Sequence, residues 1–391
     1  MPRRTFLAAA AAARVAAANE RIRCGVIGMG GRGWYLAGVF REIGAEVAAV
    51  CDVYEPRREA GLKQASPGAR AFVDYRRLLE DKSLDAVVIA TPDFWHARMA
   101  VDAVEAGKDI YLEKPMAHGI DEGFRIVEAV RRTRRVAQVG TQRRSYDVYH
   151  EAKQVLDSGA AGEIRLVTAN WLNHQRSLVP PDLKGKLDWD LFLGDVAPKR
   201  PFDPVRFFNY LYFWDYAGGM LAGQGAHIVD GIHYMLGSRA PLAVTAAGGR
   251  PNLAGAEITE TASMTVEYPE NYLLVFTVGY KAMRYNMFND QMQQFHGSRA
   301  RFDLGRESWA LWPQSSAVEM KASRERRSPG TFEGASRVHV QDFLDCVKSR
   351  QDPAGTVELG QSTNIVLSMA MESLRTGRRL KWNAAARRAE A

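Results

Sequence analysis

The chain has 391 residues, of which 46% are hydrophobic and 25% are charged. This composition is typical of an ordinary globular protein, the length predicts two domains, and no apolar run is long enough to cross a bilayer. Three of the seven net positive charges come from Arg3, Arg4 and Arg14, in an N-terminal segment without acids. The charge that remains is too small to indicate nucleic acid as a partner.

Residues 1–18 have the order expected of a targeting segment. Arg3 and Arg4 are followed by an alanine-rich run that ends at Ala16-Ala-Ala18. This order resembles a twin-arginine export signal and predicts a periplasmic protein. The alternative is a frayed alanine-rich helix at the start of a cytoplasmic protein. In either case these residues are left out of the fold prediction.

The run from Arg23 to Leu36 predicts a buried strand, a glycine turn and a helix. Gly28, Gly30 and Gly33 have the G-x-G-x-x-G spacing that lets a pyrophosphate approach the backbone at a helix N-terminus. Nineteen residues after Gly33, the apolar run Val47–Cys51 ends at Asp52, where a Rossmann unit places the carboxylate that binds the adenosine ribose. This combination predicts a site for NAD, with NADP the alternative.

The chain then alternates between strands and helices. Expected strands at 71–73, 85–90, 109–112 and 136–139 are separated by helices that begin near Pro56, at 75–79, at 96–106 and at 121–133. This alternation predicts a doubly wound parallel sheet of six strands that closes near residue 142. Residues at the carboxyl ends of its strands should line the cofactor cleft. With the glycine turn, the expected cofactor-binding residues are Gly28, Met29, Gly30, Gly31, Arg32, Gly33, Asp52, Arg57, Thr91, Pro92, His96, Glu113 and Lys114.

Beyond residue 142 the pattern changes. A helix at 146–157 leads to expected strands at 163–171, 242–247, 262–268 and 272–280, which have no helices of the crossover type between them. They predict an α/β domain with a large open, mainly antiparallel sheet. Helices at 338–349 and 357–375 should cover that sheet, the second returning toward the first domain. The predicted domains are 19–142 and 143–383, with a disordered tail at 384–391.

Three other features bear on partners. The aromatic- and proline-rich excursion 173–215 is too poor in glycine and serine for a linker, and predicts a binding loop. The run Arg131-Arg-Thr-Arg-Arg135 ends a predicted helix and is interpreted as a solvated face. Cys24, Cys51 and Cys346 lack metal or disulfide spacing and are expected to be buried thiols, so no metal site is predicted.

The order of the motifs resembles the Gfo/Idh/MocA family of NAD(P)-dependent sugar oxidoreductases. The glycine turn and Asp52 are followed by Thr91-Pro92, by Glu113-Lys114-Pro115, and by the glycine-rich run from Gly218 to Asp230 that contains His227. The resemblance covers essentially the whole chain after residue 20. It implies a Rossmann domain, an α/β domain with an open sheet, and a site between them. It also implies that Lys114 hydrogen-bonds the reacting hydroxyl and that His227 removes its proton.

The chemistry of these two residues supports the same roles. A lysine at a strand end beside a cationic nicotinamide should have its ammonium form disfavoured, and histidine titrates near neutrality. His227 is expected on a helix from Gly225 to Leu236. The chain departs from the family at Gly223, where an Asp usually lies one helical turn before the histidine. His227 would then act alone, or Asp215 or Asp230 would replace that carboxylate, or the chemistry differs from simple alcohol oxidation.

Candidate substrate-binding residues are Arg143, Trp171, Trp214, Asp215 and His227, with core or loop packing the alternative for the aromatic and arginine side chains. His96 and His174 are open between ligand binding and structure, and His233 is expected to be structural.

Three functions remain open. The first is an NAD-dependent oxidoreductase acting on a sugar or sugar derivative. The second is an NAD-dependent glycoside hydrolase or lyase that works through a transient keto-sugar, and the third is a non-catalytic sensor. The apolar open sheet also predicts a homo-oligomer, and neither nucleic acid nor a membrane is expected as a partner.

Overall fold

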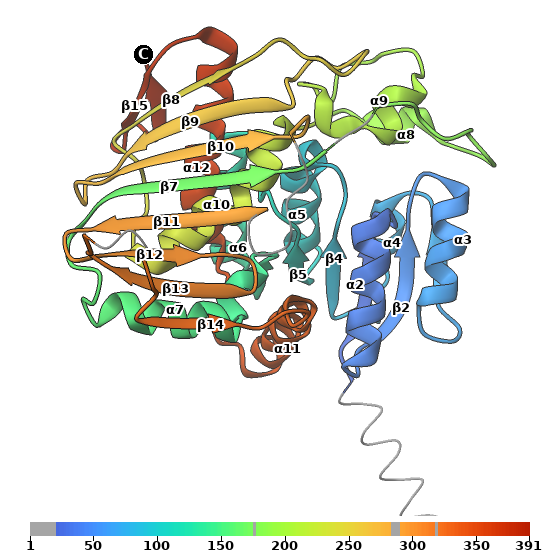
Figure 1. Ribbon diagram of the computed structural model, residues 1–391. Helices are drawn as coiled ribbons and strands as arrows, with labels where there is room; N and C mark the ends of the chain where they lie inside the picture. The colour runs from blue at the N-terminus through green and yellow to red at the C-terminus, as the bar shows by residue number, and fades with distance from the viewer. Residues whose placement is uncertain (1–20, 175–176, 283–289, 317–319) are drawn as a thin grey trace, which may run out of the picture.

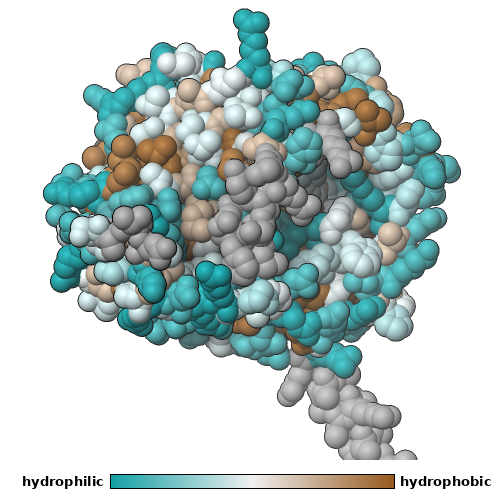
Figure 2. Space-filling view, in the orientation of Figure 1, coloured by the Kyte–Doolittle hydropathy of each residue, from teal (hydrophilic) through white to brown (hydrophobic). Residues whose placement is uncertain are grey.

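The computed structural model describes residues 21–174, 177–282, 290–316 and 320–391 (Figure 1). The expected export signal, residues 1–18, lies outside this part of the chain. A six-stranded sheet and a ten-stranded sheet form the two domains, in agreement with the predicted fold class. Within the described residues, no helix combines the length and apolar character needed to cross a membrane. The surface seen in Figure 2 is mainly hydrophilic.

The nucleotide domain is the predicted doubly wound sheet. Its strands are β1 (Arg23–Ile27), β2 (Glu46–Cys51), β3 (Arg70–Phe72), β4 (Ala86–Ile89), β5 (Asp109–Leu112) and β6 (Ala137–Val139). They are parallel and lie in the order β3-β2-β1-β4-β5-β6. Successive strands are added on one side of β1 up to β3 and on its other side from β4 onward, and such sheets bind ligands at this reversal, outside the carboxyl ends of the strands.

Helices cover both faces of this sheet because its central strands are apolar on both sides. They are α2 (Gly31–Glu42), α3 (Glu55–Gln64), α4 (Tyr75–Leu79), α5 (His96–Glu105) and α6 (Ile120–Thr133), with the short 3-10 helices η1 (Asp93–Trp95) and η2 (Gln142–Ser145). Val26 in β1 and Val88 in β4 are fully buried, as expected of parallel strands between helical layers.

The ten-stranded sheet forms the second domain. Its order is β14-β13-β12-β11-β7-β10-β9-β8-β15-β16, and among the described residues β7 and β10 are the one parallel pair. The strands are β7 (Ile164–Leu172), β8 (Ala243–Gly248), β9 (Thr261–Glu267), β10 (Leu273–Gly279), β11 (Gln291–Gly297), β12 (Ala300–Leu304), β13 (Ser308–Pro313), β14 (Arg324–Arg327), β15 (Leu380–Asn383) and β16 (Arg388–Glu390).

Helices cover one face of this sheet and leave the other open. In the view of Figure 1, α10 (Gly219–Leu236) and α12 (Val357–Thr376) lie behind it, near α7 (Asp147–Asp157). The alternate residues Leu274, Phe276 and Val278 of β10 are buried against that helical layer. α12 also contacts α6, which confirms its predicted return toward the first domain.

Helix α11 (Phe332–Ser349) corrects one prediction. It was expected to cover the large sheet, but it packs on the nucleotide domain, next to α2. Its buried residues Val340, Phe343 and Val347 lie at helical spacing, and Phe343 contacts the rings of Phe40 and Tyr111. The apolar stripe predicted a buried helix correctly, but it did not specify which surface the helix covers.

The carboxyl-terminal residues correct a second prediction. The prediction of a disordered tail at 384–391 is wrong, because this segment turns back as β16 and pairs with β15 at the edge of the large sheet. The Asn383 side chain stabilises the turn: its oxygen accepts from the amide of Ala386 at 3.0 Å and its nitrogen donates to Glu390 at 3.0 Å. The three cysteines are buried and free, as predicted.

Candidate active site

The glycine turn between β1 and α2 has the shape required for a bound pyrophosphate. Gly28 has φ +87°, and a Cβ on Gly33 would lie 1.8 Å from the Gly28 carbonyl oxygen. By contrast, a Cβ built on Gly30 would have no atom of another described residue within 4 Å, its chain neighbours and local helix backbone aside. Gly28 and Gly33 are therefore required by the fold itself, whereas Gly30 keeps a space open. α2 begins there without a side-chain cap, which leaves amide groups to bind an anion.

Asp52 follows β2 and is fixed by its own backbone contacts. Its carboxylate accepts hydrogen bonds from the amides of Met29 at 2.7 Å and Tyr54 at 2.9 Å. Burial raises the pKa of Asp52, and the positive charge of Arg57 opposes that change. Carboxylate oxygens have further lone pairs, so ribose hydroxyls can still bind. This arrangement fits the predicted role of Asp52 in holding NAD.

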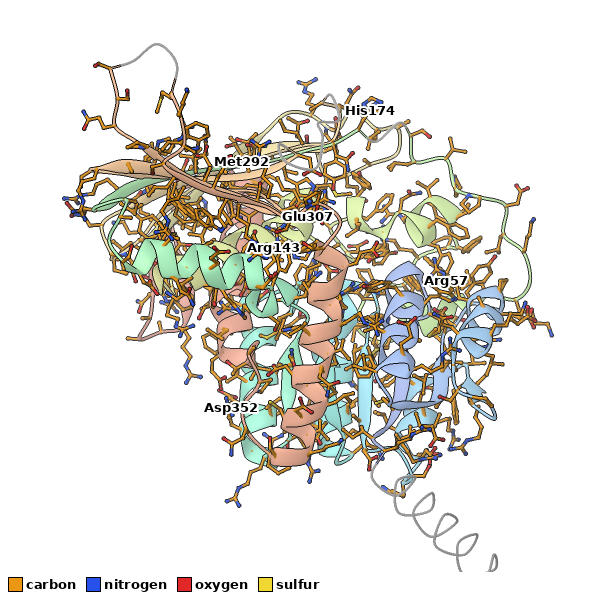
Figure 3. All side chains as sticks on the ribbon, turned by 60° about the horizontal axis from the view of Figure 1, so that its bottom comes forward. Arg57, Arg143, His174, Met292, Glu307 and Asp352 are labelled. Carbon is orange, nitrogen blue, oxygen red and sulfur yellow. The ribbon has the colours of Figure 1, made fainter. Side chains whose placement is uncertain are left out.

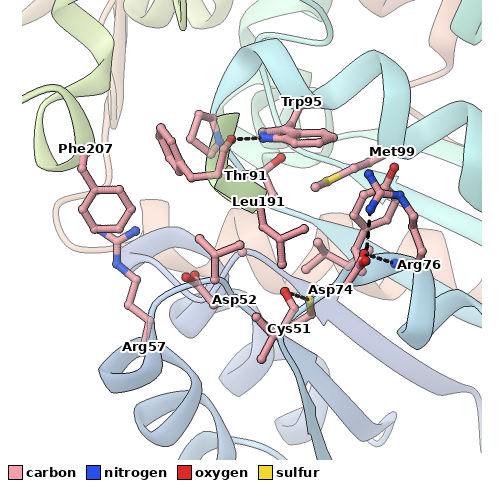
Figure 4. Close-up of a pocket in the computed structure, with 17 residues that line it drawn as sticks. Cys51, Asp52, Arg57, Asp74, Arg76, Thr91, Trp95, Met99, Leu191 and Phe207 are labelled. Atoms are coloured by element: carbon pink, nitrogen blue, oxygen red, sulfur yellow. Dashed lines mark hydrogen bonds and ion pairs between the residues drawn. The ribbon is translucent and has the colours of Figure 1, made fainter. Parts of the chain in front are cut away.

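A pocket beside Asp52 has the apolar walls that an adenine ring requires (Figure 4). Its walls come from the predicted cofactor residues Arg57, Thr91 and Pro92, and also from Val53, Val73, Trp95, Met99, Leu191, Phe192 and Phe207. The last three belong to the excursion 173–215 and were not predicted individually. Their signal in the sequence was the aromatic-rich composition of that segment, which predicts a binding loop.

His96 differs from its expected role. The ring is 1% exposed, and its two nitrogens face the carbonyl oxygens of Pro115 at 2.7 Å and Thr91 at 3.0 Å. Burial lowers its pKa. A neutral ring donates to only one of these carbonyl oxygens, but both nitrogens lie against backbone, so His96 packs between the loops after β4 and β5 and is not positioned to bind the cofactor.

Lys114 follows β5 and points toward α10. Its ammonium donates to the carbonyl oxygen of Gly223 at 3.3 Å. Burial lowers the pKa of Lys114, the negative charges of Glu113 and Asp93 oppose that change, and the positive charges of Arg32 and Arg143 add to it. The neighbouring Glu113 accepts from Arg32 at 2.6 Å. Burial at the strand end thus disfavours the ammonium form of Lys114, the direction that the sequence predicts.

His227 lies one helical turn after Gly223 on α10. Its ring stacks on Trp171 with centroids 5.7 Å apart. Burial, together with the positive charges of Lys114 and Arg143, lowers the pKa of His227 well below its ordinary value. A neutral imidazole can accept a proton, and among the described residues neither of its nitrogens has a hydrogen-bond partner.

The start of α10 corrects the predicted helix, because it begins at Gly219 and not at Gly225. Gly223 is therefore part of the helix. Among the described residues outside its own stretch of helix, a Cβ at Gly223 would have only Leu211 within 4 Å, at 3.9 Å. The space that a family Asp would occupy is open beside His227.

Neither proposed substitute carboxylate pairs with His227. Asp230 is buried and binds Arg144 through both oxygens, at 2.8 and 3.0 Å. Asp215 lies 2.6 Å from Arg200 in an ion pair and also contacts Arg206. Of the alternatives left open by the sequence, the structure therefore retains a histidine that acts alone or a different chemistry.

The other expected substrate residues are dispersed. Trp214 lies under the guanidinium of Arg375 at 5.3 Å, in a separate hollow beside α6 and α12. Arg143 is 2% exposed, donates to Tyr149 at 2.6 Å and to Gln291, and lies 5.7 Å from the Trp171 ring. Figure 3 shows it near the junction of the domains, far from Arg57 on the nucleotide domain. Arg143 is thus a buried residue whose guanidinium packs on the Trp171 ring.

Of the other two histidines considered in the sequence analysis, one is structural and one is exposed. His233 is buried and pairs with the Tyr268 hydroxyl at 2.8 Å, as its expected structural role requires. His174 is exposed and forms an isolated bridge with Lys281.

Asp93 is a site residue that the sequence reasoning missed. It directly follows Thr91-Pro92, is 4% exposed, and its pKa is raised to about 7 by burial, with the charge of Lys114 opposing the change. The signal in the sequence that could have identified Asp93 was its position directly after Thr91-Pro92, at the end of a strand.

Two family models match this chain. The NAD-binding Rossmann fold of the GFO_IDH_MocA oxidoreductase family matches residues 22–141, and the C-terminal alpha/beta domain of the same family matches residues 166–270. Together they match the nucleotide domain and the first part of the second domain, with Asp52, Lys114 and His227 inside the matched residues.

Individual relatives are similar to parts of this chain. Inositol 2-dehydrogenase 2 of Saccharopolyspora erythraea is 32% identical over 59% of this chain and 58% of its own length. An alpha-N-acetylgalactosaminidase of Shewanella oneidensis is 33% identical over 31% of this chain and 28% of its own length. The chain therefore spans little more than half of the first of these relatives.

Solved structures share the fold over almost the whole chain. Levoglucosan dehydrogenase in complex with NADH and levoglucosan superimposes with a TM-score of 0.74, at 16% identity, over 92% of this chain and 99% of that one. The two family models together match more than half of the chain, which therefore belongs to the Gfo/Idh/MocA family of oxidoreductases.

Proposed function

We propose that the protein is an NAD-dependent oxidoreductase that transfers hydride between a sugar hydroxyl carbon and nicotinamide. The observation that carries this proposal is the pair Lys114 and His227, which come from different domains and have lowered pKa values beside the cofactor site. Alcohol oxidation requires a group that accepts the hydroxyl proton, as a neutral imidazole can, and a group that polarises the reacting oxygen, as a lysine can. The similarity to inositol 2-dehydrogenase 2 supports a polyol or sugar as substrate.

The residues present fit NAD. The open space at Gly30 would receive the pyrophosphate, and Asp52 would bind the adenosine ribose. Arg32 has a buried guanidinium nitrogen, and Thr91 a buried hydroxyl, without a hydrogen-bond partner in the described part of the chain. Both atoms lie in residues predicted to contact the cofactor. When bound, NAD supplies a nicotinamide ring that accepts a hydride.

The chain's own residues handle the proton. As the hydride leaves the substrate carbon, the hydroxyl proton passes to the neutral imidazole of His227, and the C–O bond becomes a carbonyl. Lys114 holds and polarises the reacting oxygen. Trp171 presents its ring beside His227, a suitable surface for the apolar face of a sugar. The charges balance, because one hydride and one proton leave together.

The test is a substrate screen. Purified protein is incubated with NAD and a panel of inositols, aldoses and glycosides, and reduced nicotinamide is measured by absorbance. The proposal expects substrate-dependent reduction that is lost in Lys114→Ala. Reduction that persists unchanged in this variant would contradict the role of the site.

A second candidate is an NAD-dependent glycosidase, favoured by Gly223 and by the similarity to an alpha-N-acetylgalactosaminidase. In this reaction the hydride is removed from the sugar, the glycosidic bond breaks by elimination beside the transient ketone, water adds, and the hydride returns. Turnover of a glycoside in deuterated water separates the two candidates. Solvent deuterium beside the oxidised carbon indicates elimination, whereas its absence with net formation of NADH indicates simple oxidation.

We also propose export through the twin-arginine route, on the basis of residues 1–18. Such a protein would carry NAD out with it in the folded state. A periplasmic enzyme without a free nicotinamide pool must regenerate the cofactor in place. The cycle would then be redox-neutral, through a second substrate that accepts the hydride or through its return to the same sugar.

A further inference from the structure

Residues 184–195 of the second domain lie across the nucleotide domain, and we name this segment the strap. It runs antiparallel to the loop that follows Asp52. Tyr54 and Leu187 form a β-bridge. The amide of Glu55 donates to the carbonyl oxygen of Lys186 at 2.8 Å, and the amide of Asp188 donates to that of Val53 at 3.1 Å. The strap is therefore attached by backbone bonds next to the predicted ribose site.

Side chains strengthen this attachment. The amide of Lys184 donates to the Tyr54 hydroxyl at 2.9 Å, and the amide of Lys186 donates to the Glu55 carboxylate at 2.9 Å. These contacts are made by the strap's backbone and by nucleotide-domain side chains on one side of the pocket.

The other end of the strap is fixed on the opposite side of the pocket. The indole nitrogen of Trp95 donates to the carbonyl oxygen of Phe192 at 2.7 Å in a buried position. A Cβ built on Gly194 would lie 2.4 Å from the Trp95 ring, so the backbone packs directly on the indole. The strap is thus fastened at both ends, to the loops after β2 and after β4.

Between these two ends, the strap forms a wall of the pocket beside Asp52. Leu191 and Phe192 line it together with Phe207, and the Arg57 guanidinium lies 4.7 Å from the Phe207 ring (Figure 4). A nucleotide whose ribose binds Asp52 would have its base between these side chains and those of the nucleotide domain. Its adenosine half would then contact the strap through Leu191 and Phe192.

We propose that the strap and Phe207 hold the adenosine half of NAD and keep the cofactor bound from one turnover to the next. This inference rests on the proposed function, because it takes NAD as the ligand. It makes NAD a resident cofactor and not a substrate that exchanges in each cycle. The hydride accepted in one half of the cycle would then have to be passed on before the cofactor leaves.

The test compares two leucine truncations in one segment of chain. Leu191 lines the pocket, whereas Leu183 is 40% exposed and lies just outside the strap. The full-length protein is loaded with NADH, passed through a desalting column, and mixed with excess NAD while nicotinamide fluorescence reports release. Wild type should retain NADH through the column and release it more slowly than it turns over. Leu191→Ala should release NADH about tenfold faster, the loss expected when one buried leucine contact is removed, and Leu183→Ala should behave as wild type.

Two results would overturn the proposal. Release from wild type that is faster than turnover would show an exchanging cofactor. Equal release from Leu191→Ala, Leu183→Ala and wild type would show that the strap contributes nothing, with circular dichroism confirming that each variant is folded. If wild type does not bind NADH at all, the cofactor assignment fails as well, so this outcome is distinguishable from failure of the strap alone.

Discussion

The ammonium nitrogen of Lys114 lies 3.3 Å from the backbone carbonyl oxygen of Gly223, one helical turn before His227. This carbonyl is a backbone group that any residue at position 223 would present, so it positions the lysine without replacing the carboxylate that the family usually has there. Burial lowers the pKa of Lys114, and the negative charges of Glu113 and Asp93 oppose that change. Burial also lowers the pKa of His227, and the positive charge of Lys114 lowers it further.

Lys114→Ala should lower kcat by about 10² to 10⁴-fold, the range for loss of a general acid–base group. NADH binding should remain, because the glycine turn and Asp52 are unchanged. The measurement is kcat on the substrate found in the screen, together with an NADH titration by fluorescence. Lys153→Ala, on the surface of α7, is the matched control. A similar loss in both variants would assign the effect to general damage.

Gly223→Asp should restore a carboxylate beside Lys114 and raise the pKa values of both Lys114 and His227. The limb of the kcat/KM profile that reports deprotonation of these groups should therefore move to higher pH. Gly223→Ala controls for the change in helix propensity and should leave the limb in place. Coincident profiles for the two variants would show that no charge interaction had been introduced.

The same helix offers a test of packing. Gly223→Ala should stabilise the protein by about 0.5–1 kcal/mol, because a mid-helix glycine is replaced where space is open. Gly225→Ala should destabilise it, since its Cβ would lie 2.8 Å from Leu367. Denaturant unfolding measures both free energies. A loss of stability in Gly223→Ala would mean that the space beside His227 is not open.

Much of the site was predictable because it follows from short-range sequence order. The apolar strands end in residues that meet at one edge of a parallel sheet, so Asp52, Thr91 and Lys114 could be placed together. The surface on which α11 packs could not be predicted, because an amphipathic helix pattern does not specify the surface that its apolar face covers. The contacts that residues 173–215 make with the nucleotide domain could not be predicted either, because they join residues that lie far apart in the sequence.

Strand β11 was not predicted from the sequence, for a different reason. Its inward-facing residues include Gln291 and Gln293, which are 4% and 0% exposed. Gln293 donates to the buried Tyr149 hydroxyl at 3.0 Å. Polar residues therefore occupy positions where the alternation of a strand is expected to be apolar, and the usual signal is missing.

Asp52 should select NAD over NADP, because its carboxylate repels a 2′-phosphate. Asp52→Asn should reduce the discrimination by about 1–3 kcal/mol, the scale of charge-assisted hydrogen bonds. The amide oxygen of asparagine can still accept from one backbone amide, so this variant is less disruptive than alanine. Dissociation constants for both cofactors are measured. Equal affinity of wild type for NAD and NADP would contradict the assigned role.

His339 should make the fold sensitive to acid. Burial lowers its pKa to about 4, below the value near 6.5 of an unfolded chain. Between these values the unfolded state binds more protons, so the free energy of unfolding is highest above pH 6.5 and falls as pH decreases toward 4. The contribution should be about 1–3 kcal/mol. His339→Gln should reduce the slope of stability against pH in this window, measured by urea unfolding. Parallel curves would exclude His339 as a source of the slope.

Replacing Arg3 and Arg4 with lysine should retain the full-length protein in the cytoplasm, because the twin-arginine route depends on that pair. Fractionation of cells followed by immunoblotting measures the distribution. The same fraction of protein in the periplasm for wild type and the double variant would contradict export by this route.

The position of α11 also affects how the protein is made. Translation delivers the nucleotide-binding sequence first, yet Val340 and Phe343 reach its core only after the chain has been made through α11. Until then, Phe40 and Tyr111 lack part of their packing in the growing chain. Full packing of the nucleotide domain therefore requires that much of the second domain has already been synthesised. A prematurely terminated chain would lack this part of the core and would be a natural target for chaperones or proteases.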